Sequence, residues 1–208
     1  MLKVYGRRNS SNVQKVLWCC AEIGVPFERV DMGREFGGNR EPVYLAMNPN
    51  ALVPTIVEDD GFTLWESNAI VRYLARRYAS SGLYPEELKA VALCEQWMDW
   101  QLHSLNEAFT PLFHGLVRES VEKRNLELIE KSRGDTQRHL AMLDRHLHDS
   151  RYVAGEVFSV ADIPVGIYAY RWYTFDALQR DPLPALERWY VELQQRAAYR
   201  ETVMVGLA

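Results

Sequence analysis

Residues 9–12 (NSSN) combine hydroxyl and amide side chains directly before a segment whose apolar residues recur every three or four positions. That recurrence predicts a helix with one apolar face. Ser11 and Gln14 have the spacing of a Ser-x-x-Gln capping box, so we expect Ser11 to be the N-cap and Ser10 to lie just outside the helix. The Ser10 hydroxyl could then donate a hydrogen bond to an anion at the positive end of the helix. A capping cluster with no further role is the alternative interpretation.

The cysteines of the chain are poorly placed to supply that anion. A Cys-x-x-Cys pair would stand at the start of the helix, but Cys19 and Cys20 are adjacent and lie two turns further on, so we expect them to be small apolar core residues. If this helix end binds a thiol, the sulfur must come from a ligand. A thiol with a pKa of ~8.5 is only ~3% ionised at pH 7, and lowering that pKa by ~2 units requires ~2.7 kcal/mol. One charge-assisted hydrogen bond and the helix-end field together have this magnitude.

Two further segments could bind a peptide-like ligand. Residues 48–55 (NPNALVPT) lead into a strand, and a cis peptide bond before Pro54 would turn the Val53 backbone outward to pair with such a ligand. Glu66 and Ser67 open a later helix. Ser67 is either a plain N-cap or, together with Glu66, part of a site for the α-ammonium and α-carboxylate groups of an amino acid.

All these residues lie in a region that alternates between strand and helix patterns. Residues 2–5 and 27–30 flank the first helix as short strands, which predicts a βαβ unit with parallel pairing. Residues 55–57 and 62–65 flank an Asp-Gly turn, which predicts a hairpin, and a helix follows. Strand–helix–strand followed by hairpin–helix is the order of a thioredoxin-like domain. We assign this α/β domain to residues 1–79.

The rest of the chain shows only helical periodicity. We place a linker at residues 80–86 and an all-helical (all-α) domain at residues 87–208. Residues 159–162 (SVAD) form a capping box that opens one of its helices. Four aromatic residues could form the wall of an apolar pocket there, although core packing is their commoner role: these are Phe109, Phe113, Trp172 and Tyr173.

Composition excludes several classes of protein. Of the 208 residues, 48% are hydrophobic and 25% are charged, as in ordinary globular proteins. The net charge is −4, and the sequence has no Lys/Arg cluster of the kind that binds nucleic acid. No apolar run reaches the ~20 residues that cross a bilayer. The 3 cysteines are too few for a disulfide scaffold, so we expect a reducing cytoplasm, and the 5 histidines show no metal-ligand spacing.

Taken together, four segments resemble the soluble glutathione S-transferase family over nearly the whole chain: residues 10–16, 48–54, 66–74 and 159–162. Their order and spacing agree with the family pattern, which is far more specific than any one motif. The resemblance is closest to bacterial members that use a hydroxyl or an amide at the first helix. It implies a cytoplasmic, homodimeric enzyme that activates the thiolate of its co-substrate glutathione to attack a hydrophobic electrophilic small molecule.

The resemblance also implies where the thiol is activated. The catalytic hydroxyl of such relatives matches Ser10, and an assisting amide matches Asn12. Some classes use a tyrosine near the first strand, which would be Tyr5, but we expect Tyr5 to be packed in the strand and prefer Ser10. Ala51 departs from the family pattern, because glycine is commoner there, and this suggests a slightly different loop.

The remaining implied contacts hold the tripeptide. The cis-proline of the family matches Pro54, with Val53 forming backbone hydrogen bonds to the cysteine of glutathione. Glu66 and Ser67 match the pair that binds the γ-glutamyl end. Asn39 falls where a polar side chain often meets the glycyl end.

Two alternative functions remain open on the sequence. A glutathione-dependent disulfide reductase would need an enlarged, polar pocket for a mixed disulfide or a second glutathione. A binding module that keeps the fold without the chemistry is the third hypothesis, and the intact Ser10, Val53–Pro54 and Glu66–Ser67 argue against it.

Overall fold

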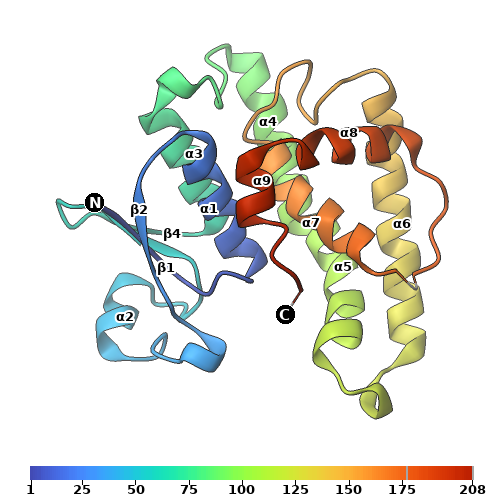
Figure 1. Cartoon of the computed structure of the whole chain (residues 1–208), viewed down its shortest axis with the longest axis horizontal. Coiled ribbons are helices and arrows are strands. Elements are labelled where there is room, and N and C mark those ends of the chain that lie inside the picture. The colour runs from blue at the N-terminus through green and yellow to red at the C-terminus, as the bar shows by residue number, and fades with distance from the viewer. Residues whose placement is uncertain (177, 208) are drawn as a thin grey trace. The chain divides into compact units, whose positions relative to one another are not determined.

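The computed structural model describes residues 1–176 and 178–207, which form two compact units that we describe separately (Figure 1). The first unit comprises Met1–Pro85 together with Arg196–Gly206, and the second comprises Glu86–Gln195 with Leu207. The first unit is α/β and the second is helical, so the predicted fold class is confirmed.

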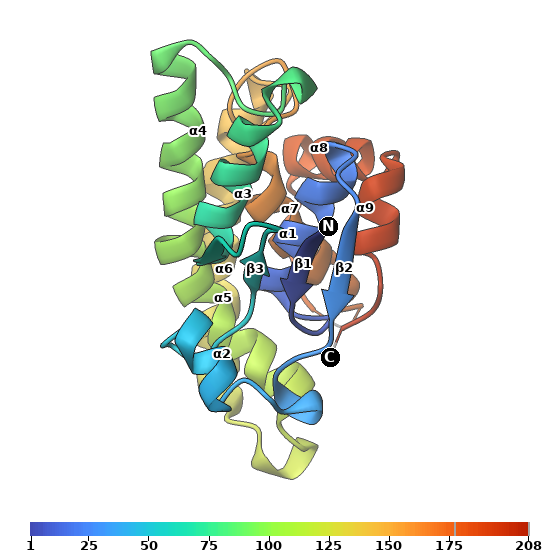
Figure 2. The same ribbon diagram turned by 90° about the vertical axis from the view of Figure 1, so that its left-hand side faces the viewer.

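A four-stranded sheet of order β2-β1-β3-β4 forms the centre of the first unit. β1 (Leu2–Tyr5) pairs in parallel with β2 (Phe27–Val30) and antiparallel with β3 (Thr55–Val57). β3 in turn pairs antiparallel with β4 (Thr63–Trp65). Figure 2 shows β1 between β2 and β3. The βαβ unit and the hairpin are therefore confirmed, with β4 beginning one residue later than predicted.

Two long helices of this unit, α1 (Ser11–Glu22) and α3 (Ser67–Arg77), pack against each other. The apolar face of α1 is buried, and Cys19 and Cys20 are fully buried within it. Burial raises the pKa of Cys20 to about 12 and raises that of Cys19 as well. Both thiols are therefore neutral near pH 7, and the expectation that they serve as apolar core residues is confirmed.

The short helix α2 (Pro42–Met47), which follows a 3₁₀ turn at Arg34–Phe36 (η1), was not predicted from the sequence. Six residues are too few to show a helical period. Pro42 at the first helical position is the signal that could have indicated it, because proline is favoured there.

The first unit also contains the helix α9 (Ala197–Thr202), although we expected the all-helical domain to run to residue 208 (Figure 1). The ring of Tyr199 packs edge-on against Trp18 of α1, with centroids 4.6 Å apart. Arg196 donates two hydrogen bonds of 2.7 Å to the carboxylate of Glu22. An amphipathic helix does not reveal its partner in sequence, which is why this return was not predicted.

The segment that we expected to link the domains is largely packed into the first unit. α3 is followed by a 3₁₀ turn at Ala79–Ser81 (η2), and Leu83 and Tyr84 are buried. Arg76 donates a hydrogen bond of 2.7 Å to the Tyr84 hydroxyl and lies over its ring. The boundary between the compact units falls after Pro85, within the predicted linker of residues 80–86.

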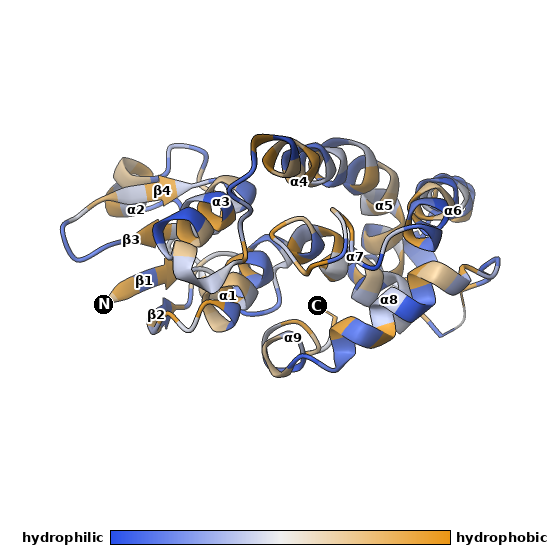
Figure 3. Cartoon of the chain, turned by 90° about the horizontal axis from the view of Figure 1, so that it is seen from above, coloured by the Kyte–Doolittle hydropathy of each residue, from blue (hydrophilic) through white to orange (hydrophobic). Residues whose placement is uncertain are grey.

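The second unit begins with one continuous helical run that contains two π-helical turns. This run consists of α4 (Leu88–Trp100), η3 (Gln101–Leu105), α5 (Asn106–Phe113) and η4 (His114–Arg118). A 3₁₀ turn at Val121–Lys123 (η5), α6 (Leu126–His148), α7 (Asp162–Thr174) and α8 (Pro184–Gln194) follow. In Figure 3 hydrophobic and hydrophilic residues alternate along α8, whose Leu186, Trp189 and Leu193 are fully buried. None of the described helices is long and apolar enough to cross a membrane.

The buried carboxylate of Asp162 joins several elements of this unit. It accepts hydrogen bonds from the Val153 amide at 2.9 Å, the Ser159 amide at 2.8 Å and the Trp189 indole at 2.9 Å. The bond to Ser159 is the carboxylate half of the predicted capping box. The helix itself starts at Asp162, and the Ser159 hydroxyl accepts a bond of 3.3 Å from the Ala161 amide.

Candidate functional site

Ser10 stands at the N-terminal end of α1, where a tight turn delivers the chain from β1. The Ser10 amide donates to the Arg7 carbonyl at 3.2 Å, and the Gln14 amide donates to the Ser10 carbonyl at 2.8 Å. Ser10, with φ −76° and ψ 126°, is therefore the N-cap, and the prediction that Ser11 has this position was wrong. The Gln14 side chain does not complete a capping box, because it is buried and donates to the Val203 carbonyl at 3.1 Å.

The Ser10 hydroxyl makes no capping hydrogen bond, although the residue is only 7% exposed. No acidic residue lies in the first turn of α1 to neutralise the positive end of this 12-residue helix. Asn12 lies at the second helical position and is half-buried. A free hydroxyl at an uncompensated helix N-terminus suits an anion such as a thiolate.

Val53 offers an open stretch of backbone beside this turn. The predicted cis bond between Val53 and Pro54 is present. The carbonyl of the preceding residue, Leu52, is already bonded: it accepts hydrogen bonds from the Tyr44 hydroxyl at 2.6 Å and from the Asn48 side-chain amide at 2.9 Å. Among the residues that the structure describes, neither the amide nor the carbonyl of Val53 has a hydrogen-bond partner. Both groups are available to an extended peptide ligand.

Gly6 allows the turn before α1 to lie directly against Val53. A Cβ placed on Gly6 would be 3.2 Å from the Val53 Cβ and only 2.4 Å from Cγ2 of Val13. The φ of Gly6 is +151°, which also favours glycine. The close approach brings the segment that carries Ser10 next to the open backbone of Val53.

Glu66 and Ser67 are brought to the same end of the sheet by the pairing of β3 with β4. Thr55 is opposite Trp65 in the antiparallel pair, so Pro54, directly before β3, and Glu66, directly after β4, lie at the same end of the two strands. α3 begins at Ser67, so Glu66 rather than Ser67 is the N-cap, with a φ of 71°. Glu66 is exposed, its side chain makes no capping bond, and Ser67 is buried at the first helical position. A carboxylate and a hydroxyl thus stand together at a second helix N-terminus.

Asn39 is tied to the loop before Val53. Its side-chain nitrogen donates to the Ala51 carbonyl at 2.6 Å, while its side-chain oxygen has no hydrogen bond within the described part of the chain. Ala51 has a φ of 56°, in the left-handed region that favours glycine. At position 51, where glycine is commoner in the family, this chain therefore holds an alanine in a conformation that favours glycine.

Tyr5 has the packed position that we expected. It lies in β1 opposite Thr55 and is half-buried, with its ring edge-on to Tyr44 at 6.1 Å. Its neighbour in the turn, Arg7, was not selected from the sequence, where two consecutive arginines look like ordinary surface residues.

The aromatic residues that we considered for a pocket wall belong largely to the core of the second unit. Phe109, Phe113 and Trp172 are almost fully buried. The rings of Phe109 and Phe113 are 6.2 Å apart, and the guanidinium of Arg171 lies 4.4 Å from the Phe113 ring centroid. Core packing is thus the role that the structure gives these three, while Tyr173 is half-buried and stacks on Tyr190.

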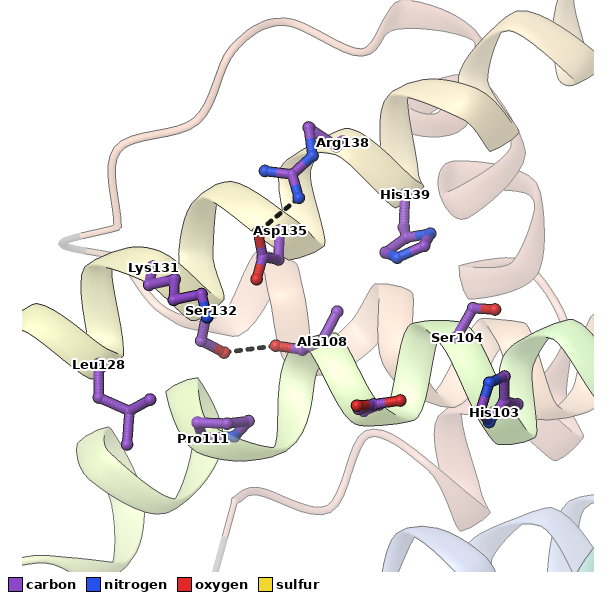
Figure 4. Close-up of a pocket in the computed structure, with 11 residues that line it drawn as sticks. His103, Ser104, Ala108, Pro111, Leu128, Lys131, Ser132, Asp135, Arg138 and His139 are labelled. Carbon is purple, nitrogen blue, oxygen red and sulfur yellow. Dashed lines mark hydrogen bonds and ion pairs between the residues drawn. The ribbon is translucent and has the colours of Figure 1, made fainter.

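A separate cavity of about 410 Å³ lies between α5 and α6 and contains none of the predicted site residues (Figure 4). Its lining is mostly polar, and burial together with the charge of Arg138 lowers the pKa of His139 there. Ser132 of α6 provides hydrogen bonds where Pro111 interrupts α5. Its hydroxyl accepts a hydrogen bond of 2.9 Å from the Leu112 amide and donates one to the Ala108 carbonyl. Within residues 1–176 and 178–207, no three His, Cys, Asp or Glu side chains gather as metal ligands.

Comparisons with known proteins identify the family to which the chain is similar. The glutathione S-transferase N-terminal domain family matches residues 1–76, and the C-terminal domain family matches residues 103–197. The chain is 40% identical over 209 residues to glutathione S-transferase GstB of Escherichia coli, with 100% of both chains covered. It is 32% identical to glutathione S-transferase 3 of Zea mays, covering 97% of this chain and 93% of that one. A crystal structure of a theta class glutathione S-transferase from Xanthomonas axonopodis pv. citri, with glutathione bound, matches with a TM-score of 0.95 and 42% identity. That match covers 100% of this chain and 99% of the other.

Proposed function

The chain belongs to the soluble glutathione S-transferase family, and on that premise we propose that Ser10 activates glutathione in this enzyme. The protein is a transferase that uses glutathione as its co-substrate. In our proposal the Ser10 hydroxyl donates a hydrogen bond to the glutathione sulfur and so lowers the pKa of the thiol. The Asn12 amide assists at the same helix end.

The observation that carries this proposal is the uncommitted hydroxyl of Ser10 at the N-terminus of α1. A hydroxyl that capped the helix would have to give up that bond, whereas Ser10 has none to lose. A hydrogen bond to an anion contributes about 1.5–3 kcal/mol and the helix end about 0.3–1 kcal/mol. The two together can lower the pKa of the thiol by ~2 units, which makes the thiolate the main species near pH 7.

We propose that glutathione binds along three features of the first unit. Its cysteine pairs with the open backbone of Val53 beside Pro54, since the Val53 amide and carbonyl lack partners within residues 1–176 and 178–207. Glu66 and Ser67 bind the γ-glutamyl end, where the exposed carboxylate meets the ammonium group and the helix N-terminus meets the carboxylate. The free side-chain oxygen of Asn39 accepts a hydrogen bond from the glycyl amide N–H.

The resemblance supports three further proposals. A hydrophobic electrophile binds against the all-helical domain, two copies of the chain form a homodimer, and the enzyme works in the cytoplasm. The alternative of a disulfide reductase is separated by substrate choice. We expect turnover of an activated aryl halide and little reduction of a small mixed disulfide of glutathione.

The experiment that tests the role of Ser10 is the pH dependence of kcat/KM with an aryl halide. We expect Ser10→Ala to raise the kinetic pKa by one to two units, roughly, and to lower kcat/KM at pH 7 on the order of tenfold. Ser11→Ala is the matched control, because it removes the neighbouring hydroxyl one position into the helix. Asn12→Ala should give a smaller shift. An unchanged pH profile in Ser10→Ala would reject Ser10 as the donor.

A further inference from the structure

Arg7 is a half-buried cation that the rest of the described chain leaves without a partner. Its Nε is buried and has no hydrogen bond. Within residues 1–176 and 178–207, its guanidinium forms no hydrogen bond and no ion pair. Guanidinium groups that lose water are normally paired with a carboxylate or a carbonyl, because an unpaired donor costs about 1–3 kcal/mol. The missing partner is therefore to be sought in a ligand.

The position of Arg7 indicates which ligand. Its carbonyl accepts the Ser10 amide, so the two residues open and close one tight turn. Its Nη1 lies 3.8 Å from the point where a Cβ on Gly33 would stand, and that same point is 3.5 Å from Cγ1 of Val53. The guanidinium and the side chain of Val53, whose backbone we assign to the cysteine of glutathione, thus both lie next to Gly33.

The charges around Arg7 do not neutralise it. Arg34 and Glu35 of η1 act on it in opposite directions, and burial together with Arg34 lowers the pKa of Arg7 from its usual value. At the end of β2, Arg29 is paired with Asp31 and donates to the Gly6 carbonyl at 3.1 Å. An arginine remains protonated in proteins despite such surroundings, so a net positive charge faces this side of the site.

We propose that Arg7 is a second electrostatic residue of the thiol site, whose charge stabilises the glutathione thiolate together with the hydrogen bond from Ser10. The inference rests on the proposed function, because that function places the sulfur at this turn. No covalent bond to Arg7 forms or breaks: the thiol loses its proton to bulk water, and the guanidinium, whose Nε–H lacks an acceptor among the described residues, faces the anion that remains and lowers its energy. A unit charge several ångströms away in a partly screened site changes a pKa by roughly 0.5–1.5 units.

The test is a direct titration of the thiol of glutathione bound to the enzyme, followed by the ultraviolet absorbance of the thiolate. We expect Arg7→Gln to raise that pKa by roughly 0.5–1.5 units and Arg7→Lys to restore most of it. Arg8→Gln is the matched control. Arg8 is the adjacent, exposed arginine and donates to the Glu201 carbonyl at 2.6 Å, so its removal should shift the pKa by less than ~0.2 units.

Several results would overturn the inference. They are an unchanged pKa in Arg7→Gln, an equal shift in Arg8→Gln, and a shift that Arg7→Lys does not reverse. Weaker glutathione binding at an unchanged thiol pKa would also overturn it, because the guanidinium would then meet a carboxylate of the tripeptide. Should Arg7→Gln fail to fold, Arg7→Met, which keeps the apolar stem of the side chain, provides the test with the same expected rise of the thiol pKa. An unchanged thiol pKa in Arg7→Met would overturn the inference.

The two single variants distinguish this inference from the role of Ser10. Because both groups would act on one sulfur, the shift in Ser10→Ala/Arg7→Gln is expected to differ from the sum of the single shifts. A shift with Ser10→Ala and none with Arg7→Gln keeps Ser10 as the donor and removes Arg7. The opposite pattern removes the hydroxyl and keeps the charge.

Discussion

Replacing Asp162 should destabilise the second unit more than any other single change that we consider. The carboxylate is fully buried and accepts bonds from two backbone amides and the Trp189 indole. Asp162→Ala leaves three buried donors without an acceptor, at about 1–3 kcal/mol each, so we expect a loss on the order of 3–9 kcal/mol. A typical domain has about 5–15 kcal/mol of stability, so this is a large part of the whole.

The same residue should make stability depend on pH. Burial raises the pKa of Asp162 from the ordinary value of 3.8 to about 6. The hydrogen-bond donors around the carboxylate act in the opposite direction but do not cancel this effect. The folded state therefore binds the proton more tightly than the unfolded state. The stabilisation that this gives is complete below about pH 4 and is lost as the pH rises through about 6. The full change is on the order of 3 kcal/mol.

The assay is urea denaturation of the wild type, Asp162→Ala and Asp162→Asn at several pH values from about 4 to about 7. It measures both the loss of stability in Asp162→Ala and the pH dependence of stability. The stability of the wild type relative to Asp162→Asn should fall across this range, because asparagine does not titrate. A loss below about 1 kcal/mol in Asp162→Ala would refute the reasoning, since it would mean that the three donors find other acceptors.

Two further predictions concern local conformation. Ala51→Gly should stabilise the protein by about 0.5–1 kcal/mol in thermal unfolding, because it relieves the left-handed strain of φ 56° at some entropic cost. Ala141→Gly in α6 is the control of opposite sign, and a loss at both positions would contradict this explanation. Ser132→Ala should cost about 1–3 kcal/mol in urea denaturation, because the Leu112 amide loses its acceptor. Ser104→Ala, which lines the same cavity, should change stability by less than ~0.5 kcal/mol, and equal losses would show that Ser132 has no special part.

The fold could be predicted well because its signals are local. Alternation in residues 2–5, the Asp-Gly turn of the hairpin and the periodicity of α1 each depend on neighbouring residues. The starts of two helices could not be predicted as well. Gln14 has the spacing of a capping box, but a residue far along the chain, Val203, accepts its side-chain hydrogen bond. Glu66 occupies a left-handed conformation that no rule of sequence expects of glutamate.

The candidate site could be predicted in part for the same reason. Ser10, Val53 and Glu66 stand in recognisable motifs, and the sheet register then brings the last two to one end. Arg7 has no motif. The role that we propose for Arg7 rests on the absence of a hydrogen-bond or ion-pair partner among the described residues, which only a folded structure can show.

The return of α9 to α1 has a consequence for how the molecule is made. Synthesis runs from the N-terminus, so the strands and helices of the first unit emerge long before the segment that covers Trp18. Until residues 196–206 leave the ribosome, that indole lacks its aromatic cover and Glu22 lacks its arginine. A nascent chain, or a fragment that ends near residue 195, should therefore hold an incomplete first unit, which proteases cleave and chaperones bind more readily.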